Sequence, residues 1–195
     1  MAQLKIYVQA EIKDVKTGKL LRRSRKKLCH SYIIALINIL RCMMNYSADA
    51  STTDTSDASK TLGGNYGGGY RMYTVGGAGD ATLGIQAGTG TQAIAITDNK
   101  LKTLILHGDT STKLNYGATS VGLPATVGTT RSFTISRTLT NNSGADIIVN
   151  EVGLVVSCHD NAGGNPFFLI EHSLLTFTIT TGTSGTVTYT ISATV

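Results

Sequence analysis

The chain has 195 residues, of which 41% are apolar and 15% are charged, and its formal net charge is +5. This length favours a single domain over residues 1–195 and suffices for a core without disulfide or metal support. The polar residues are mainly Thr, Ser and Asn, and there are 22 Gly, a composition that favours strands and turns. With only two Pro, the Gly-rich parts are not expected to be stiff linkers.

The N-terminal stretch LKIYVQAEI, residues 4–12, alternates apolar and polar side chains. This period of two predicts a strand with one buried face. KDVKTGK then predicts a hairpin turn with Gly18 at the tight position, and LLRRSRKKL predicts the returning strand. No continuous apolar signal segment is present at the N-terminus, so we expect synthesis in a cytoplasm.

The returning strand carries a run of basic side chains: Lys19, Arg22, Arg23, Arg25, Lys26 and Lys27. Three interpretations stay open. The run can guard an edge strand against aggregation, contact the phosphates of a nucleic acid, or meet an acidic subunit. No aromatic residue interleaves the run, which argues against single-strand binding by base stacking.

SYIIALINILRCMMN, residues 31–45, predicts a helix with Ser31 as its N-cap. A helical stripe contains Ile33, Leu36, Ile37, Leu40 and Met44, and further apolar residues widen it almost all round. Such a helix lies deep in the domain or is covered by a neighbouring subunit. The apolar run is about half the length that spans a bilayer, so we expect no membrane insertion.

Residues 47–79 form a Gly-, Ser- and Tyr-rich segment that contains Tyr66, Tyr70 and Tyr73. A structureless loop of this length is unusual within a compact domain. It is either a mobile surface loop or an arm, inserted in the sandwich domain, that orders against another subunit. Tyrosines among glycines offer flat contact area at low entropic cost.

GTGTQA, residues 88–93, fits a dinucleotide-binding fingerprint in its letters. That fingerprint requires a following helix, whereas IAIT favours a strand, so we expect no nucleotide site. Asp98 is expected to cap a short helical turn that carries Leu101, Leu104 and Ile105.

The C-terminal half predicts short strands separated by polar turns, ending in a hairpin around TTGTSG. Within ADIIVNEVGLVVS the apolar set changes parity, from Ile147 and Val149 to Val152 and Leu154, at Asn150–Glu151. A β-bulge at that point would re-aim the strand. Together these features predict an all-β fold, an antiparallel β-sandwich of jelly-roll or Ig-like type with one N-terminal helix.

TLTNNSGADIIVNEVGLVVS and the following FFLIEHSLLTFTITTGTSGTVTYTIS resemble virion structural proteins of tailed bacteriophages, of tail-fibre, tail-tip or head-decoration type. AGTGTQAIAITDNKL, the VKTGKLL hairpin and the SYIIALINIL helix are similar in placement, so the resemblance covers most of the chain outside residues 47–79. It departs at EHSLL, where Glu171–His172 stands in place of a basic residue. The resemblance implies a virion structural protein.

We find no catalytic signature in the sequence. The histidines His30, His107, His159 and His172 are scattered, and no nucleophile motif accompanies them. Cys29–His30 and Cys158–His159 suggest zinc only weakly, because neighbours on a strand point to opposite faces. The three Cys are odd in number and do not indicate a disulfide framework. We expect no enzyme, cofactor or metal.

The leading hypothesis is a virion structural protein, without catalysis, that assembles with copies of itself and other virion subunits as a capsid decoration or tail component. The expected assembly interface is Ile33, Ile34, Ile37, Leu40, Tyr66, Tyr70 and Tyr73. Arg22, Arg23, Arg25, Lys26 and Lys27 are expected to contact phosphate or an acidic partner. Two alternatives remain: a subunit of a non-viral extracellular filament assembled by strand addition, and a receptor- or glycan-binding tip module.

Overall fold

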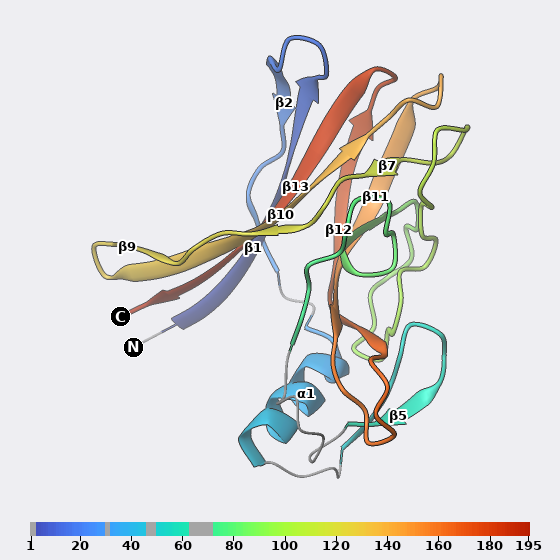
Figure 1. The fold of residues 1–195 in the computed structure, drawn as a ribbon. Coiled ribbons are helices and arrows are strands. Elements are labelled where there is room, and N and C mark those ends of the chain that lie inside the picture. The colour runs from blue at the N-terminus through green and yellow to red at the C-terminus, as the bar shows by residue number, and fades with distance from the viewer. Residues whose placement is uncertain (1–2, 30–31, 46–49, 63–71) are drawn as a thin grey trace.

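The computed structural model describes residues 3–29, 32–45, 50–62 and 72–195. Two antiparallel sheets pack face to face, and one helix lies at the lower end of the pair (Figure 1). The sequence-based prediction of an all-β sandwich with one N-terminal helix is therefore confirmed.

Sheet A is the larger sheet and has the strand order β2-β1-β13-β10-β7, with β3 beside β1 and with β8 and β9 beside β10. Its strands are β1 (Gln3–Asp14), β2 (Leu20–Arg23), β3 (Lys27–Leu28), β7 (Asn115–Tyr116), β8 (Ser120–Val121), β9 (Ala125–Val127), β10 (Thr130–Thr140) and β13 (Thr183–Thr194).

Sheet B has the order β12-β11-β6, formed by β12 (Phe167–Ile179), β11 (Ile147–Ser157) and β6 (Gly84–Gly88). A separate hairpin of β4 (Ser51–Thr53) and β5 (Ser59–Thr61) lies near the helix α1 (Ile34–Asn45).

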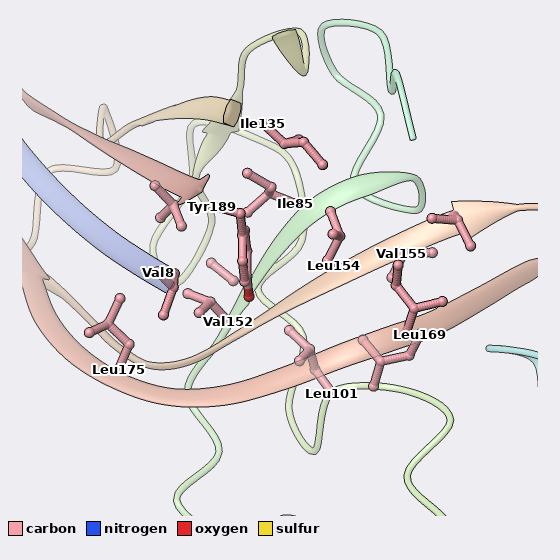
Figure 2. Packing of buried hydrophobic residues seen from close by; sticks show 14 of the residues in the cluster. Val8, Ile85, Leu101, Ile135, Val152, Leu154, Val155, Leu169, Leu175 and Tyr189 are labelled. Atoms are coloured by element: carbon pink, nitrogen blue, oxygen red, sulfur yellow. The ribbon is translucent and has the colours of Figure 1, made fainter. Parts of the chain in front are cut away.

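The core lies between the two sheets and is built from alternate residues of each strand. Val8 and Tyr189 of sheet A meet Ile85, Val152 and Leu154 of sheet B, and all five are nearly inaccessible to solvent (Figure 2). Burial of side chains of this size contributes about 1.5–3 kcal/mol each. The alternation that predicted the strands is therefore the pattern that fills the core.

The predicted N-terminal hairpin is present, and Gly18 has the positive φ of 68° that its turn requires. The returning chain pairs with β1 as two short strands, β2 and β3, rather than as one. β1 also pairs with β13 along its whole length, from Gln3 to Asp14. β1 is thus paired on one edge along its whole length and on the other edge at residues between Tyr7 and Lys13, so most of it is not free to complete a neighbour's sheet, which counts against the filament alternative.

The helix begins at Ile34, and its buried face carries Ala35, Ile39 and Cys42. Ile33, which we expected at an assembly interface, lies in the core before the first turn and is 1% exposed. That expectation was wrong for Ile33, because the segment entering the helix packs against β12, where the Ile33 N–H donates to the Ile170 carbonyl at 3.2 Å.

The described parts of the 47–79 segment pack on their own chain. Ala50, Thr52 and Leu62 are buried in and beside the β4–β5 hairpin. Tyr73 pairs through its backbone with Ser157, with N–O distances of 3.0 and 2.7 Å. These stretches are therefore neither a free loop nor an arm, while Tyr66 and Tyr70 lie outside the described residues.

The predicted helical turn after Asp98 is absent from the described residues of this stretch. Asp98 instead accepts the Ala95 N–H in a tight turn at 3.0 Å. Leu101 and Ile105 are buried, and the chain between them bends at Lys102 and Thr103 and bridges to Gly88 at Leu104, so burial here does not require a helix.

The predicted bulge is confirmed as a shift in the pairing of β11 with β12 between Val149 and Glu151. At this point Asn150 stands opposite two residues of β12, Leu175 and Thr176. The additional residue thus lies on β12, and it lets β11 change the parity of its core-facing side chains.

Arg137 of β10 is a buried cation that holds three segments together. Its Nε donates to the Gly117 carbonyl at 2.8 Å, and its two Nη atoms donate to the carbonyls of Gly77, Asp80, Leu83 and Ile85. Its guanidinium also lies 4.8 Å from the centre of the Tyr116 ring. Burial lowers the pKa of Arg137, but the carbonyl dipoles satisfy its donors.

We expect Arg137→Lys to lower the free energy of unfolding by about 3 kcal/mol, because an ammonium cannot serve five carbonyls in a fork and buried acceptors lose their donors. Arg131→Lys is the matched control, since Arg131 is exposed and, among the described residues, its side chain hydrogen-bonds to Thr126 alone. The control should change stability by less than about 0.5 kcal/mol. Urea denaturation of both variants measures the difference, and equal effects would contradict this role of Arg137.

Candidate functional site

Glu151 is a fully buried carboxylate on the face of sheet B that points away from sheet A. Its Oε1 accepts the N–H groups of Gly90 at 3.0 Å and Thr103 at 2.8 Å, and its Oε2 accepts that of Lys102 at 3.1 Å. These bonds fasten the loop after β6 to β11. The interruption of β11 thus places a carboxylate where backbone donors converge.

The glycines of GTGTQA make room for this carboxylate. A Cβ on Gly88 or on Gly90 would lie 2.5 Å from Oε1 of Glu151, closer than atoms can approach. The stretch that resembles a phosphate-binding fingerprint therefore cradles a carboxylate of its own chain.

His172 of β12 lies between Glu151 and Asp98. Its Nε2 is 2.7 Å from Oε2 of Glu151, and its Nδ1 is 3.0 Å from Oδ2 of Asp98. Both ring nitrogens face carboxylates, so the imidazolium form donates to both. Burial alone would lower the pKa of His172, but these two hydrogen bonds outweigh burial and raise it.

The pKa values of the two carboxylates are lowered, whereas that of His172 is raised. Burial would raise the pKa of Glu151, yet the hydrogen bonds from His172 and from the backbone N–H groups hold it below its usual value. Burial likewise opposes ionisation of Asp98, and Lys102 and Ala95 lead the contacts that lower its pKa. The cluster is therefore one cation between two anions, and its imidazolium has no lone pair with which to take a proton.

Glu171 and Ser173 project from the opposite face of β12, toward Tyr189 in the core. The Ser173 hydroxyl donates to Oε1 of Glu171 at 2.5 Å. Burial raises the pKa of Glu171, because the desolvation of its carboxylate outweighs the hydrogen bonds that favour ionisation. Within the described part of the chain, Oε2 of Glu171 has no hydrogen-bond partner. Glu171 and His172 are neighbours in the sequence but project from opposite faces of β12. The pKa of the Glu171 carboxyl and the pKa of the His172 imidazole are both raised.

The predicted assembly residues on α1 are partly exposed. Ile34, Ile37 and Leu40 face solvent, at 44%, 57% and 37% exposure, and Met44 extends the same stripe. Ile96 adds to this surface, because its carbonyl accepts the Ile34 N–H at 3.0 Å. We call Ile34, Ile37, Leu40, Met44 and Ile96 the helix patch.

Of the predicted basic residues, Arg22 and Arg23 lie on β2, which is at the other end of the sandwich from α1 (Figure 1). Arg25, Lys26 and Lys27 follow in the segment that leads from β2 into β3. All five are exposed. The structure therefore does not join them to the helix patch, and the two predicted surfaces are separate.

The three cysteines are buried, and none of them forms a disulfide in the part of the chain that the structure describes. Burial raises the pKa of the Cys158 thiol to about 12 and that of Cys29 further, so both remain protonated. Across residues 3–29, 32–45, 50–62 and 72–195, no group of His, Cys, Asp or Glu side chains has the arrangement to hold a metal ion. In the same ranges, no helix has the length and apolarity to cross a bilayer.

No protein-family model matches this chain, and neither a curated protein nor a solved structure matches it. The resemblance to virion proteins therefore stays an expectation from the residues quoted for it.

Sequence reasoning missed the Asp98–His172–Glu151 cluster and Arg137. The available signal was the placement of a charged or titratable residue inside an apolar strand pattern, as in VNEVGLV and LIEHSLL. Buried charges are paired or bonded, so each such residue predicts a partner, but the pattern does not say which residue it is.

We expect His172→Gln to lower the free energy of unfolding by about 3–5 kcal/mol near pH 6, because it leaves the buried carboxylate of Glu151 without its cation and Asp98 with Lys102 alone. The raised pKa of His172 means that its contribution is complete below its unfolded pKa of about 6.5 and is lost as pH rises through the folded value. As pH falls through the lowered pKa values of Glu151 and Asp98, the two carboxylates are protonated, and the stability that their contacts with His172 contribute is lost again. Wild-type stability should therefore fall above about pH 6.5 more steeply than that of the variant.

Urea denaturation over a pH series measures both curves. His107→Gln is the matched control, because His107 is exposed and its ring only accepts the Tyr116 N–H. Parallel pH curves for wild type and His172→Gln would show that the histidine is not held as a cation.

Glu171→Gln should become progressively more stable relative to wild type as pH rises from 4 to 8. The unfolded wild-type chain ionises Glu171 above about pH 4.5, whereas burial raises the pKa of the folded carboxyl, so wild-type stability falls as pH rises from the unfolded toward the folded pKa and the amide avoids this loss. The same denaturation series measures the difference. A difference that does not vary with pH would contradict the raised pKa.

Proposed function

We propose that this protein is a structural subunit that assembles with copies of itself, and that its place is in the virion of a tailed bacteriophage. The single observation that carries the assembly proposal is the helix patch. Ile37 at 57% and Met44 at 88% exposure leave apolar side chains in water on a helix whose other face is already packed.

The free energy gained by covering the helix patch is sizeable in comparison with the stability of a domain. Covering a side chain such as Ile or Leu contributes about 1.5–3 kcal/mol. Several such residues side by side amount to a sizeable part of the 5–15 kcal/mol by which a domain is stable. A second copy of the same chain supplies a complementary apolar surface without a further partner, and isologous contacts of this kind are the commonest route to dimers.

The free end of sheet A supports the same proposal. β9, the start of β10 and the outer ends of β1 and β13 extend past sheet B (Figure 1). Leu4, Leu123, Val127 and Val195 are among the most exposed apolar side chains there. A single layer of sheet with uncovered apolar residues is a further surface for a neighbour.

The virion part of the proposal is supported by the resemblance of residues 138–157 and 167–192 to tailed-phage virion proteins. The fold agrees with that role, since a β-sandwich offers rigid surfaces for subunit contacts, but folds alone do not specify functions. The tip-module alternative relied on Tyr66 and Tyr70, which lie outside the described residues.

We expect the protein to sediment as an oligomer or polymer at micromolar concentration and Ile37→Glu to shift it toward the monomer. A charge in the centre of the helix patch must lose its hydration for the contact to form. Val15→Glu is the matched control, because Val15 is exposed in the β1–β2 turn, away from both proposed surfaces. It should leave the sedimentation profile unchanged.

A wild-type protein that remains monomeric at high micromolar concentration would overturn the assembly proposal. Imaging of the purified assemblies tests the place in the virion. Filaments or tubes favour a tail role, closed shells or spikes favour a decoration role, and neither form would remove the virion part of the proposal.

A further inference from the structure

A groove of about 530 Å³ runs between the edge of sheet B and the basic segment 22–27. Its floor includes Ile12 of β1 and Leu175 and Phe177 of β12, and its wall is the basic segment. The volume is within the range of about 300–1,000 Å³ that is usual for ligand sites.

The charge of this groove is positive and only partly compensated. Arg23 Nε lies 2.8 Å from Oε1 of Glu11, and Lys26 Nζ lies 4.7 Å from the centre of the Tyr7 ring. Arg22 and Arg25 have no side-chain partner within the residues that the structure describes, and no described Asp or Glu lines the groove. Two guanidinium groups are therefore available to an anion at its mouth.

The backbone of β12 provides the second feature. β12 is an edge strand of sheet B, and the first half of its free edge is occupied. Thr55 N–H donates to the Phe167 carbonyl at 2.9 Å, and Lys27 Nζ donates to the Leu174 carbonyl at 2.7 Å. Beyond Leu174, no described segment other than β11 pairs with residues 175–178, so their outer edge is open to another strand.

We propose that this groove binds an extended acidic segment of a partner polypeptide, which adds as a strand to β12 at residues 175–178 and places carboxylates against Arg22 and Arg25. An added strand satisfies the free backbone groups of β12, and its alternate side chains point toward the apolar floor and the cationic rim. Carboxylates match guanidinium groups in bidentate geometry. This proposal is independent of self-association through the helix patch.

A nucleic acid fits the groove less well. Its phosphates would use the cations, but it offers no backbone that pairs with a strand edge. Bases bind by stacking on exposed aromatic faces, and Phe177 in the floor is 4% exposed. The open strand edge therefore favours a polypeptide.

The test is a fluorescence-anisotropy titration with a labelled short peptide in which Glu alternates with Val. We expect saturable binding that weakens about tenfold or more in Arg22→Ser/Arg25→Ser, because charge-assisted hydrogen bonds are lost. Lys16→Ser/Lys19→Ser removes the same charge from exposed positions in the β1–β2 turn outside the groove and should weaken binding by less than about twofold.

A second variant tests the strand edge. Thr176→Pro removes the backbone N–H of an exposed residue in this part of β12 and should abolish binding, and an unchanged circular-dichroism spectrum checks that the fold persists. In NMR spectra of the wild type, the peptide should shift the amide signals of residues 175–178.

Absence of saturable binding would overturn the proposal, as would equal losses in the two charge variants. Tighter binding of oligothymidylate that is unaffected by Thr176→Pro would replace the polypeptide by a nucleic acid. Aggregation of Arg22→Ser/Arg25→Ser with undiminished peptide binding would show that the basic segment only guards the edge.

Discussion

The buried carboxylate of Glu151 is the constraint on which the outer layer of this fold depends. Desolvated charge of this kind persists only with several donors around it, and here those donors come from His172 and from the backbone of the loop after β6. The same requirement fixes the loop in space, demands glycine at positions 88 and 90, and draws in Asp98 behind the histidine. One polar residue in β11 thereby organises some fifteen residues of irregular chain.

That loop covers the face of sheet B which sheet A does not, so β11 is buried on both faces from Glu151 onward. Sheet A has no equivalent cover at its free end, where Leu123 and Val195 are more than 80% exposed. The helix patch is a second apolar surface that the described residues leave exposed. The surfaces left for partners are thus the places where the internal layers end, and this is the physical basis for proposing an assembly role.

The sequence predicted those features whose signal is local. The alternation of apolar and polar residues predicted β1 and β13, and Gly18 predicted the turn after β1. The change in which alternate residues are apolar at Asn150 predicted the bulge. It could not choose which side of an almost wholly apolar helix is buried, and Ile33 was misplaced for that reason. Nor could it pair Glu151 with His172 or Arg137 with five carbonyls, because those partners are set by tertiary packing between distant segments.

The two candidate partner surfaces differ in the force that would act at them. The helix patch is apolar, and the groove beside Arg22 and Arg25 is cationic with an open strand edge. Salt screens contacts at the groove and does not weaken burial at the helix patch. The helix α1 and the strand β2, which carries Arg22, also lie at opposite ends of the molecule (Figure 1), so a partner at one of them does not block a partner at the other. A subunit built this way can join copies of itself through one end and hold an acidic partner strand at the other, and rising salt would release the partner before it dissolves the assembly.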